Sequence, residues 1–154
     1  MADYKKKQVK QKTSPKGKTI NQGGNPENYY SLKPSWIFNS TDRAVWTFSK
    51  DNTGDLFWEE ILPKLQGLES QTWGEILVNN KKENHSIEVN NLSKKARKRL
   101  TQCYIEAESI ISLRLTGTHR LYGYISGNSF TILWFDKNYG DNDECVCRSH
   151  KKHT

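Results

Sequence analysis

The sequence predicts an α+β domain whose antiparallel sheet ends in a three-stranded meander. Three stretches rich in β-branched and aromatic residues, 110–115, 121–125 and 130–135, follow one another closely. The short segments between them, 116–118 and 126–128, each hold a central glycine, as tight turns require. Amphipathic stretches lie upstream of these strands. We therefore expect helices packed on one face of the sheet.

The upstream elements are predicted from periodicity. Residues 44–48 are rich in β-formers and predict a strand. Apolar residues recur at helical spacing over 55–68 and again over 72–78, and Pro63 predicts a kink or two short helices in the first of these. Residues 85–89 alternate between polar and apolar types, which predicts a short strand.

A helix with one basic face is predicted after Ser93, which is suited to cap it. Its expected apolar stripe consists of Leu92, Ala96, Leu100, Cys103 and Tyr104. The opposite face holds Lys94, Lys95, Arg97, Lys98 and Arg99. Clustered positive charges repel one another and favour an anionic partner. RNA phosphate is one such partner, acidic protein side chains are another, and a solvated helix face is the third interpretation.

The net charge of +7 is unevenly distributed. Residues 1–18 contain seven lysines and one aspartate, whereas the other 136 residues carry 17 basic and 16 acidic side chains. Residues 1–35 also lack apolar periodicity. We therefore expect a flexible, lysine-rich tail over 1–35, either phosphate-binding or merely solubilising, and a single domain over 36–154.

The same sequence predicts a cytoplasmic protein without cofactor or membrane partner. No apolar run is long enough to span a bilayer, and an odd number of cysteines does not suggest a secreted disulfide framework. Cys145, Cys147, His150 and His153 could bind zinc, but the long loop between ligand pairs typical of zinc fingers is missing. A polar terminus with reduced thiols is the favoured alternative. A calcium loop over 136–147 is set aside because its spacing does not fit.

The meander also offers a candidate site. Arg120, Tyr122 and Tyr124 share one strand face, and an exposed stripe of this kind would suit RNA phosphates and bases. The alternative interpretation puts the tyrosines in the core. Metal-free RNA cleavage needs a base, an acid and a cation. The candidate catalytic residues are Arg114, His119, Arg120, Tyr122, His150 and His153, with Glu88 as an alternative base.

Residues 92–100, 112–117 and 119–124, followed by a hydrophobic strand at 132–135, occur in an order that resembles the RelE/ParE-type toxins. The resemblance covers roughly residues 85–136. It implies a small α+β protein that cuts mRNA on the ribosome and binds a cognate antitoxin, or, as in the ParE branch, targets DNA gyrase. Arg114 and Arg120 would then face the substrate. The long N-terminal segment and the acidic loop after residue 136 depart from that pattern.

Three functional hypotheses follow from these observations. The first is an RNA-directed, toxin-like protein that acts as a metal-independent endoribonuclease, with RNA-binding residues on the basic helix and at Tyr124. The second is a non-catalytic nucleic-acid-binding protein or an accessory protein of a phage or mobile element. The third is a protein-interaction module with exposed aromatic side chains.

Overall fold

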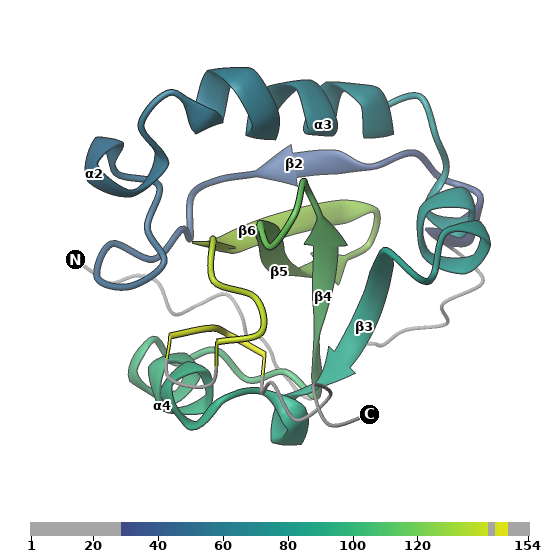
Figure 1. Cartoon of the computed structure of the whole chain (residues 1–154). Helices are drawn as coiled ribbons and strands as arrows, with labels where there is room; N and C mark the ends of the chain where they lie inside the picture. The colour runs from purple at the N-terminus through teal and green to yellow at the C-terminus, as the bar shows by residue number, and fades with distance from the viewer. Residues whose placement is uncertain (1–28, 142–143, 148–154) are drawn as a thin grey trace.

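A mixed five-stranded sheet lies at the centre of the structure, with helices above and below it (Figure 1). The computed structural model describes residues 29–141 and 144–147. The strand order is β2-β6-β5-β4-β3, in which β2 is parallel to β6 and the other neighbours are antiparallel. In chain order the elements are β2 (Ser35–Ile37), α2 (Lys50–Thr53), the π-helical η2 (Phe57–Ile61), α3 (Leu62–Leu68), the π-helical η3 (Glu75–Asn79), β3 (Asn84–Glu88), the 3₁₀ turn η4 (Val89–Asn91), α4 (Lys94–Gln102), β4 (Ser109–Arg114), β5 (Arg120–Ser126) and β6 (Ser129–Asp136).

The three strands of the predicted meander correspond to β4, β5 and β6. Each pairs antiparallel with the next, with Leu113 opposite Leu121 and Phe135 opposite Leu121 on its other side. The turn glycines Gly117 and Gly127 have φ angles of 51° and 67°, a left-handed conformation that favours glycine. The local signals of the sequence therefore located this part of the sheet correctly.

The sheet extends further than the sequence predicts. β2 adds a parallel strand, with Trp36 opposite Phe130, so the expectation of a purely antiparallel sheet is wrong. Tyr29 and Tyr30 pack against the core. Residues 29–35, which were assigned to the tail, thus belong to the folded part, whereas the first 28 residues lie outside the described part of the chain.

The first face of the sheet is covered by the helices between β2 and β3. Leu65 and Leu68 of α3 and Ile76 of η3 are buried against Leu113 and Leu121. Full burial of a leucine or isoleucine side chain contributes about 1.5–3 kcal/mol to stability. Near Pro63, where a kink or two short helices are predicted, the π-helical η2 passes directly into α3, and the proline lies in the first turn of α3.

The second face is covered by α4, so the expectation of helices on one face only is wrong. Ala96 and Leu100 of α4 pack against Ile110, Tyr122 and Trp134. Successive side chains along the central strands point to opposite faces, and here both sets are apolar and buried. Such strands require a helix or other cover on each face of the sheet. In Figure 1, α3 lies above the sheet and α4 lies below it.

The predicted strand at 44–48 is also wrong, since the segment has no regular structure. The Asp42 carboxylate accepts hydrogen bonds from the backbone N–H groups of Ala44 and Val45, at 2.8 and 3.3 Å, and thereby turns the chain. Trp46 follows with a φ of 45°, which is unusual for a residue with a side chain. The β-formers of this segment therefore serve packing and not strand pairing.

Helix α4 ends in a Schellman motif that holds a tyrosine at the usual glycine position. The N–H of Ile105 bonds to the carbonyl of Leu100 at 2.9 Å, and the N–H of Tyr104 bonds to the carbonyl of Thr101 at 3.1 Å. Tyr104 has a φ of 59° and its side chain is 83% exposed, so it is not part of the predicted apolar stripe.

We expect Tyr104→Gly to stabilise the protein by up to about 1 kcal/mol, because glycine adopts this left-handed conformation without the steric cost of a Cβ. Urea unfolding monitored by circular dichroism measures the change. Tyr104→Ala is the matched control, because it removes the same ring but keeps the Cβ, and it should give no comparable gain. Equal effects of the two variants would contradict the backbone explanation.

Candidate nucleic-acid interface

The basic face of α4 gathers several exposed cations on one short helix. The Ser93 hydroxyl caps the helix by accepting a hydrogen bond from the Ala96 N–H at 3.1 Å, as predicted. With Ala96 and Leu100 turned into the core, the other side of the helix exposes Lys94, Lys95, Arg97 and Lys98. Among the described residues, none of these four forms a salt bridge with a carboxylate. Their charge is available to an external anion.

Arg99 departs from the prediction that it binds RNA. Its Nε and Nη2 donate to the two Asp42 oxygens at 2.7 and 3.0 Å, so most of the guanidinium is used within the protein. This bidentate pair joins α4 to the loop of residues 38–49. Arg99 therefore positions the interface and does not contribute a free cation to it.

Asp42 connects four groups at this junction. Besides Arg99 and the two backbone N–H groups, its carboxylate accepts a hydrogen bond from the Trp134 indole at 2.9 Å. Burial of Asp42 opposes ionisation, but the hydrogen bonds, that from Arg99 foremost, lower its pKa below the ordinary value. Asp42 is thus an ionised carboxylate that holds the loop, α4 and β6 together.

Trp46 lies on the same loop and links it to the basic helix. Its ring packs edge-on against Trp134 at a centroid distance of 5.1 Å, and its indole N–H donates to the Glu144 carbonyl at 2.9 Å. The Lys95 ammonium lies 5.0 Å from the centroid of the Trp46 ring, within cation–π range. These contacts hold the loop in one place beside α4.

An aromatic cluster lies where the two ends of this loop meet. Phe38 contacts Phe48 and Phe57 with ring centroids 6.0 and 6.3 Å apart, and Phe57 contacts Trp58 at 5.3 Å. Trp58 is 68% exposed and Phe38 is 40% exposed. A hollow of about 590 Å³ opens beside them, lined by Phe48, Lys50, Thr53, Gly54, Asp55, Phe57 and Trp58. We call this the aromatic hollow.

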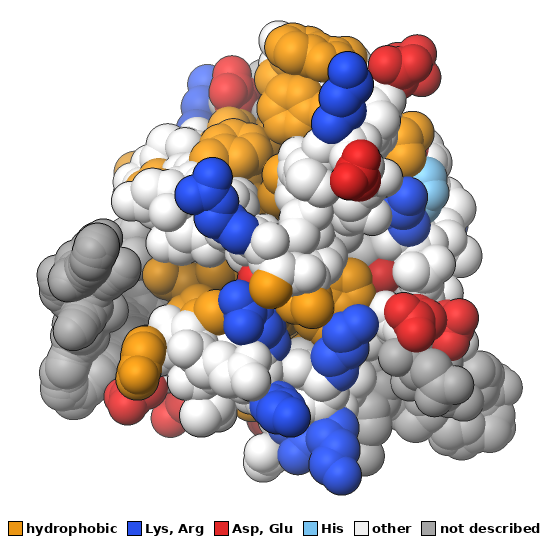
Figure 2. Space-filling model, turned by 90° about the vertical axis from the view of Figure 1, so that its left-hand side faces the viewer, with side chains coloured by type: hydrophobic (Ala, Val, Ile, Leu, Met, Phe, Trp, Pro, Cys, Tyr) orange, Lys and Arg blue, Asp and Glu red, His pale blue; other side chains and the backbone are white. Residues whose placement is uncertain are grey.

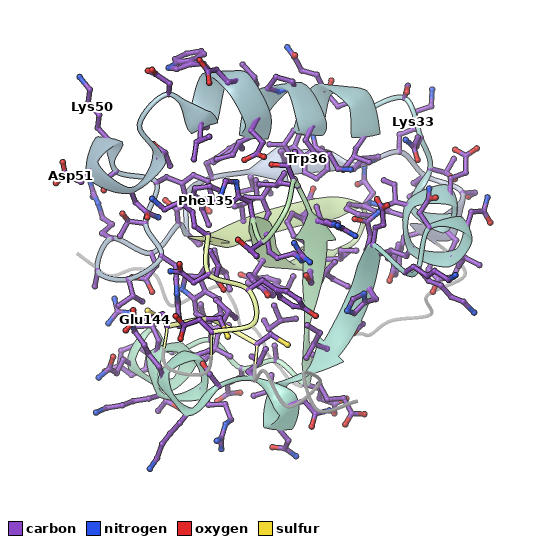
Figure 3. The ribbon with its side chains drawn as sticks, viewed as in Figure 1. Lys33, Trp36, Lys50, Asp51, Phe135 and Glu144 are labelled. Carbon is purple, nitrogen blue, oxygen red and sulfur yellow. The ribbon has the colours of Figure 1, made fainter. Side chains whose placement is uncertain are left out.

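The aromatic hollow and the basic helix lie on one side of the molecule. Figure 2 shows this side, with the largest group of hydrophobic side chains in its upper half, bordered by charged side chains of both signs, and a group of Lys and Arg side chains in its lower half. In Figure 3, Lys50 extends outward from α2 at the edge of the same side. The sequence analysis did not identify the hollow. The signal was there, because Trp58 lies off the apolar stripe predicted for residues 55–68.

Two of the predicted catalytic residues, Arg114 and Arg120, come together at one end of the sheet. They are direct partners across β4 and β5, which places them side by side on the face that α4 covers in part. Arg114 is exposed, whereas Arg120 is buried, and burial lowers the pKa of Arg120. Arg120 donates to the carbonyls of Gly117 and His119 and stacks on Tyr139 at 4.0 Å. Much of the hydrogen-bonding capacity of the Arg120 guanidinium is thus used inside the protein.

Asp136 lies opposite Arg120 on β6 and partly compensates its charge. Its carboxylate is fully buried and accepts hydrogen bonds from the N–H groups of Asn138 and Val146, both at 2.8 Å. Burial raises the pKa of Asp136, although these hydrogen bonds and Arg120 act in the other direction. Arg120 and Asp136 therefore depend on each other for charge balance.

The predicted Arg-Tyr-Tyr stripe is not exposed. Tyr122 is completely buried in the core under α4, and Tyr124 is only partly accessible, so the alternative interpretation holds for Tyr122. Burial raises the pKa of Tyr122 well above its ordinary value, with Asp136 adding to the effect. The stripe cannot serve as a platform for RNA bases because α4 covers the face on which it lies.

His119 lies on the other face of the sheet from Arg120. Its Nδ1 is 2.6 Å from a carboxylate oxygen of Glu60, and its ring packs edge-on against Phe135 at 5.8 Å. His119 therefore does not face the arginine pair, and the prediction that it acts with Arg120 is wrong. The other predicted histidines, His150 and His153, lie outside the described residues.

His85 is the histidine that the sequence analysis missed on the arginine side of the sheet. It pairs with Ser112, two residues before Arg114 on β4, and side chains two apart on a strand share a face. A second hollow of about 360 Å³ is lined by His85, Ser86, Ile87, Glu88, Asn91, Tyr139 and Cys147. Tyr139 joins this hollow to Arg120. The alternation of residues 85–89 in the sequence predicts that His85 and Ile87 share a face of the strand, which was the available signal for His85.

The chain matches no protein-family model, no curated protein and no solved structure at a significant level. The resemblance of residues 85–136 to the RelE/ParE-type toxins therefore remains a prediction. Within the described ranges, no three His, Cys, Asp or Glu side chains are grouped to hold a metal ion, and the histidines of the suggested zinc cluster lie outside those ranges. Nor does any helix there have the length and apolar character to cross a membrane.

Proposed function

We propose that this protein binds single-stranded RNA along the face formed by α4 and the aromatic hollow. One observation carries the proposal: four exposed cations on one turn and a half of helix lack a carboxylate partner among the described residues. A cationic surface beside exposed aromatic rings is the combination by which proteins bind single strands, with phosphates on the cations and bases on the rings. The well-anchored loop between the two parts supports a common binding surface.

Charge neutralisation on α4 is expected to weaken RNA binding in a salt-dependent manner. We expect Lys94→Gln/Lys95→Gln/Lys98→Gln to reduce the slope of log K against log salt by about 2, since each phosphate contact on a single strand contributes about 0.7. Fluorescence anisotropy with a labelled oligoribonucleotide at several salt concentrations measures this slope. The full chain is used, so that the seven lysines of residues 1–18 contribute equally to every variant.

The matched control is Lys33→Gln/Lys81→Gln/Lys82→Gln, which removes the same charge from three other exposed lysines. Lys33 lies on the side of the molecule away from Lys50 (Figure 3). The control triple should leave the slope nearly unchanged. Equal effects of the two triples would mean that RNA responds to net charge alone, and the proposed interface would be wrong.

A second candidate function is metal-independent RNA cleavage at the second hollow. The observation in its favour is that His85 lines that hollow and lies on the same sheet face as the exposed Arg114, which offers an imidazole for proton transfer and a cation for phosphate. Cleavage of labelled RNA in EDTA that is lost in His85→Ala and Arg114→Ala, but kept in His119→Ala, would establish it. RNA that is bound yet stays intact would leave binding as the function.

A further inference from the structure

We infer that the aromatic hollow binds one unpaired nucleobase of the RNA, with Trp58 as the stacking surface. This inference rests on the proposed function and names the chemical group that the hollow receives. The hollow differs from an ordinary apolar patch in its lining, because aromatic, cationic and anionic side chains surround one concave space. Its volume is about 590 Å³, and it is open to solvent on one side.

The walls of the hollow suit a flat ring. Phe48, Phe57 and Trp58 line it, and Trp58 is exposed although its neighbour Phe57 is packed edge-on against it. A large exposed indole next to other aromatic rings offers a face on which a base can stack, and every base has such a face. Stacking alone therefore gives affinity with little sequence preference.

The charged side chains in the lining set the orientation that we expect for the bound nucleotide. Lys50 and Asp55 both line the hollow, and the chain between them turns at Gly54, which has a φ of 52°. No hydrogen bond or salt bridge within the described residues engages either charged side chain. Lys50 attracts the phosphate, whereas the Asp55 carboxylate repels it and accepts a hydrogen bond from a base N–H. The base thus points toward Asp55 and the backbone toward Lys50.

The position of the hollow also fits a strand that continues to α4. The two ends of the loop 38–49 meet at the Phe38–Phe48 contact, and its middle holds Asp42, which pairs with Arg99, so the loop touches both parts of the interface. The four exposed cations of α4, at the other part of the interface, favour a polyanion such as RNA over an apolar peptide as the occupant.

The test compares two oligoribonucleotides of equal length, one intact and one with abasic nucleotides, on full-length wild type and Trp58→Ala. We expect Trp58→Ala to bind the intact oligonucleotide roughly 5- to 150-fold more weakly, the effect of losing one stacked base. Both proteins should bind the abasic oligonucleotide equally. Trp58→Phe should retain most of the affinity, since it keeps an aromatic face. Tyr104→Gly, which removes an exposed aromatic outside the hollow, should not affect the difference between the oligonucleotides.

The outcomes separate this inference from the proposed function. If wild type binds RNA and Trp58→Ala binds the intact oligonucleotide as tightly, the hollow does not receive a base and the inference is overturned. An equal loss of affinity for the intact and abasic oligonucleotides would overturn it too. If wild type binds neither oligonucleotide at low salt, the proposed function itself fails. Trp58 is largely exposed, so thermal unfolding of the variants should match wild type and exclude misfolding.

Discussion

Asp42→Ala is expected to reduce the free energy of unfolding by about 3 kcal/mol, which is among the largest single effects in this protein. The substitution removes at once the acceptor of Arg99 Nε and Nη2, of the Trp134 indole and of two backbone N–H groups. A buried donor that loses its acceptor costs about 1–3 kcal/mol. The Trp134 side chain is almost fully buried, so water cannot replace the lost partner there. Urea unfolding at pH 7 measures the difference.

A double-mutant cycle with Arg99→Ala shows how much of this loss comes from the ion pair. Arg99 is partly exposed, with 26% of its side chain accessible, so its removal alone should cost less than the removal of Asp42. We expect the two substitutions together to cost less than the sum of their separate effects. Strict additivity would show that the two side chains do not stabilise each other, contrary to the geometry.

The effect should also depend on pH in a defined direction. The pKa of Asp42 is lower in the folded state than in the unfolded state, so its contribution is fully present above about pH 4, the unfolded value. That contribution is lost as the pH falls through the folded pKa. The difference in stability between wild type and Asp42→Asn should therefore shrink below about pH 4. Asp136, whose pKa is raised, acts in the opposite sense and is unchanged in both proteins.

The same substitution tests how the proposed RNA-binding face is held together. Asp42 connects the loop that carries Trp46 and Phe48 to α4 through Arg99. Loss of this connection allows the basic helix and the aromatic hollow to move relative to each other, and a single strand that spans both then pays an additional ordering entropy. Under folding conditions, Asp42→Asn should therefore bind RNA more weakly although no phosphate contact has been removed.

The parts of the fold that the sequence predicted well are those governed by neighbouring residues. Ser93 caps α4 through a bond three residues away, and Gly117 and Gly127 allow turns that only a few residue types accept. The strands on either side are long enough to be recognised by composition. For these elements the local preference and the tertiary structure agree.

The errors come from contacts between residues that are distant in the chain. Residues 44–48 have strand composition, but Asp42 turns the segment and the Trp46 ring finds its partner at Trp134. Parallel pairing of β2 with β6 joins residues more than 90 positions apart, which no local pattern reports. Tertiary packing overrides local propensity at such places.

The candidate site shows the same division. Alternation predicted that Arg120 and Tyr122 share a face, which is correct, but it cannot say whether that face meets water or a helix. Alternation also places His119 and Arg120 on opposite faces of the sheet, although they are neighbours in the sequence. His85 became visible as a neighbour only through the pairing of β3 with β4. Residue type suggested the chemistry, whereas strand pairing decided which residues meet.

Gly123→Ala is the other substitution with a large expected effect, a loss of about 3 kcal/mol or more. A Cβ at this position would lie 2.2 Å from the Thr131 carbonyl oxygen and 2.8 Å from Cζ of Phe130. Neither neighbour can move easily. The carbonyl belongs to β6, and the buried Phe130 ring is in contact with Trp36 and Trp73.

The close approach at Gly123 follows from a bulge that the core requires. Tyr122 pairs with Trp134 and Gly123 pairs with Ile132, so Leu133 is the extra residue on β6. Because of it, Leu133 and Trp134 both contribute to the core under α4, while Ile132 and Phe135 face α3. The side chains on both sheet faces depend on this irregularity, and a Cβ at Gly123 would push β5 away from it.

Gly67→Ala in α3 is the matched control, because a Cβ there meets no atom within 4 Å and alanine favours a helix. It should stabilise the protein by up to about 1 kcal/mol, while Gly123→Ala destabilises it in the same urea titration. A small effect of Gly123→Ala would mean that β5 and β6 can separate locally without loss of the core. The core would then not require the bulge, and the Trp134–Asp42 hydrogen bond would not depend on this strand register.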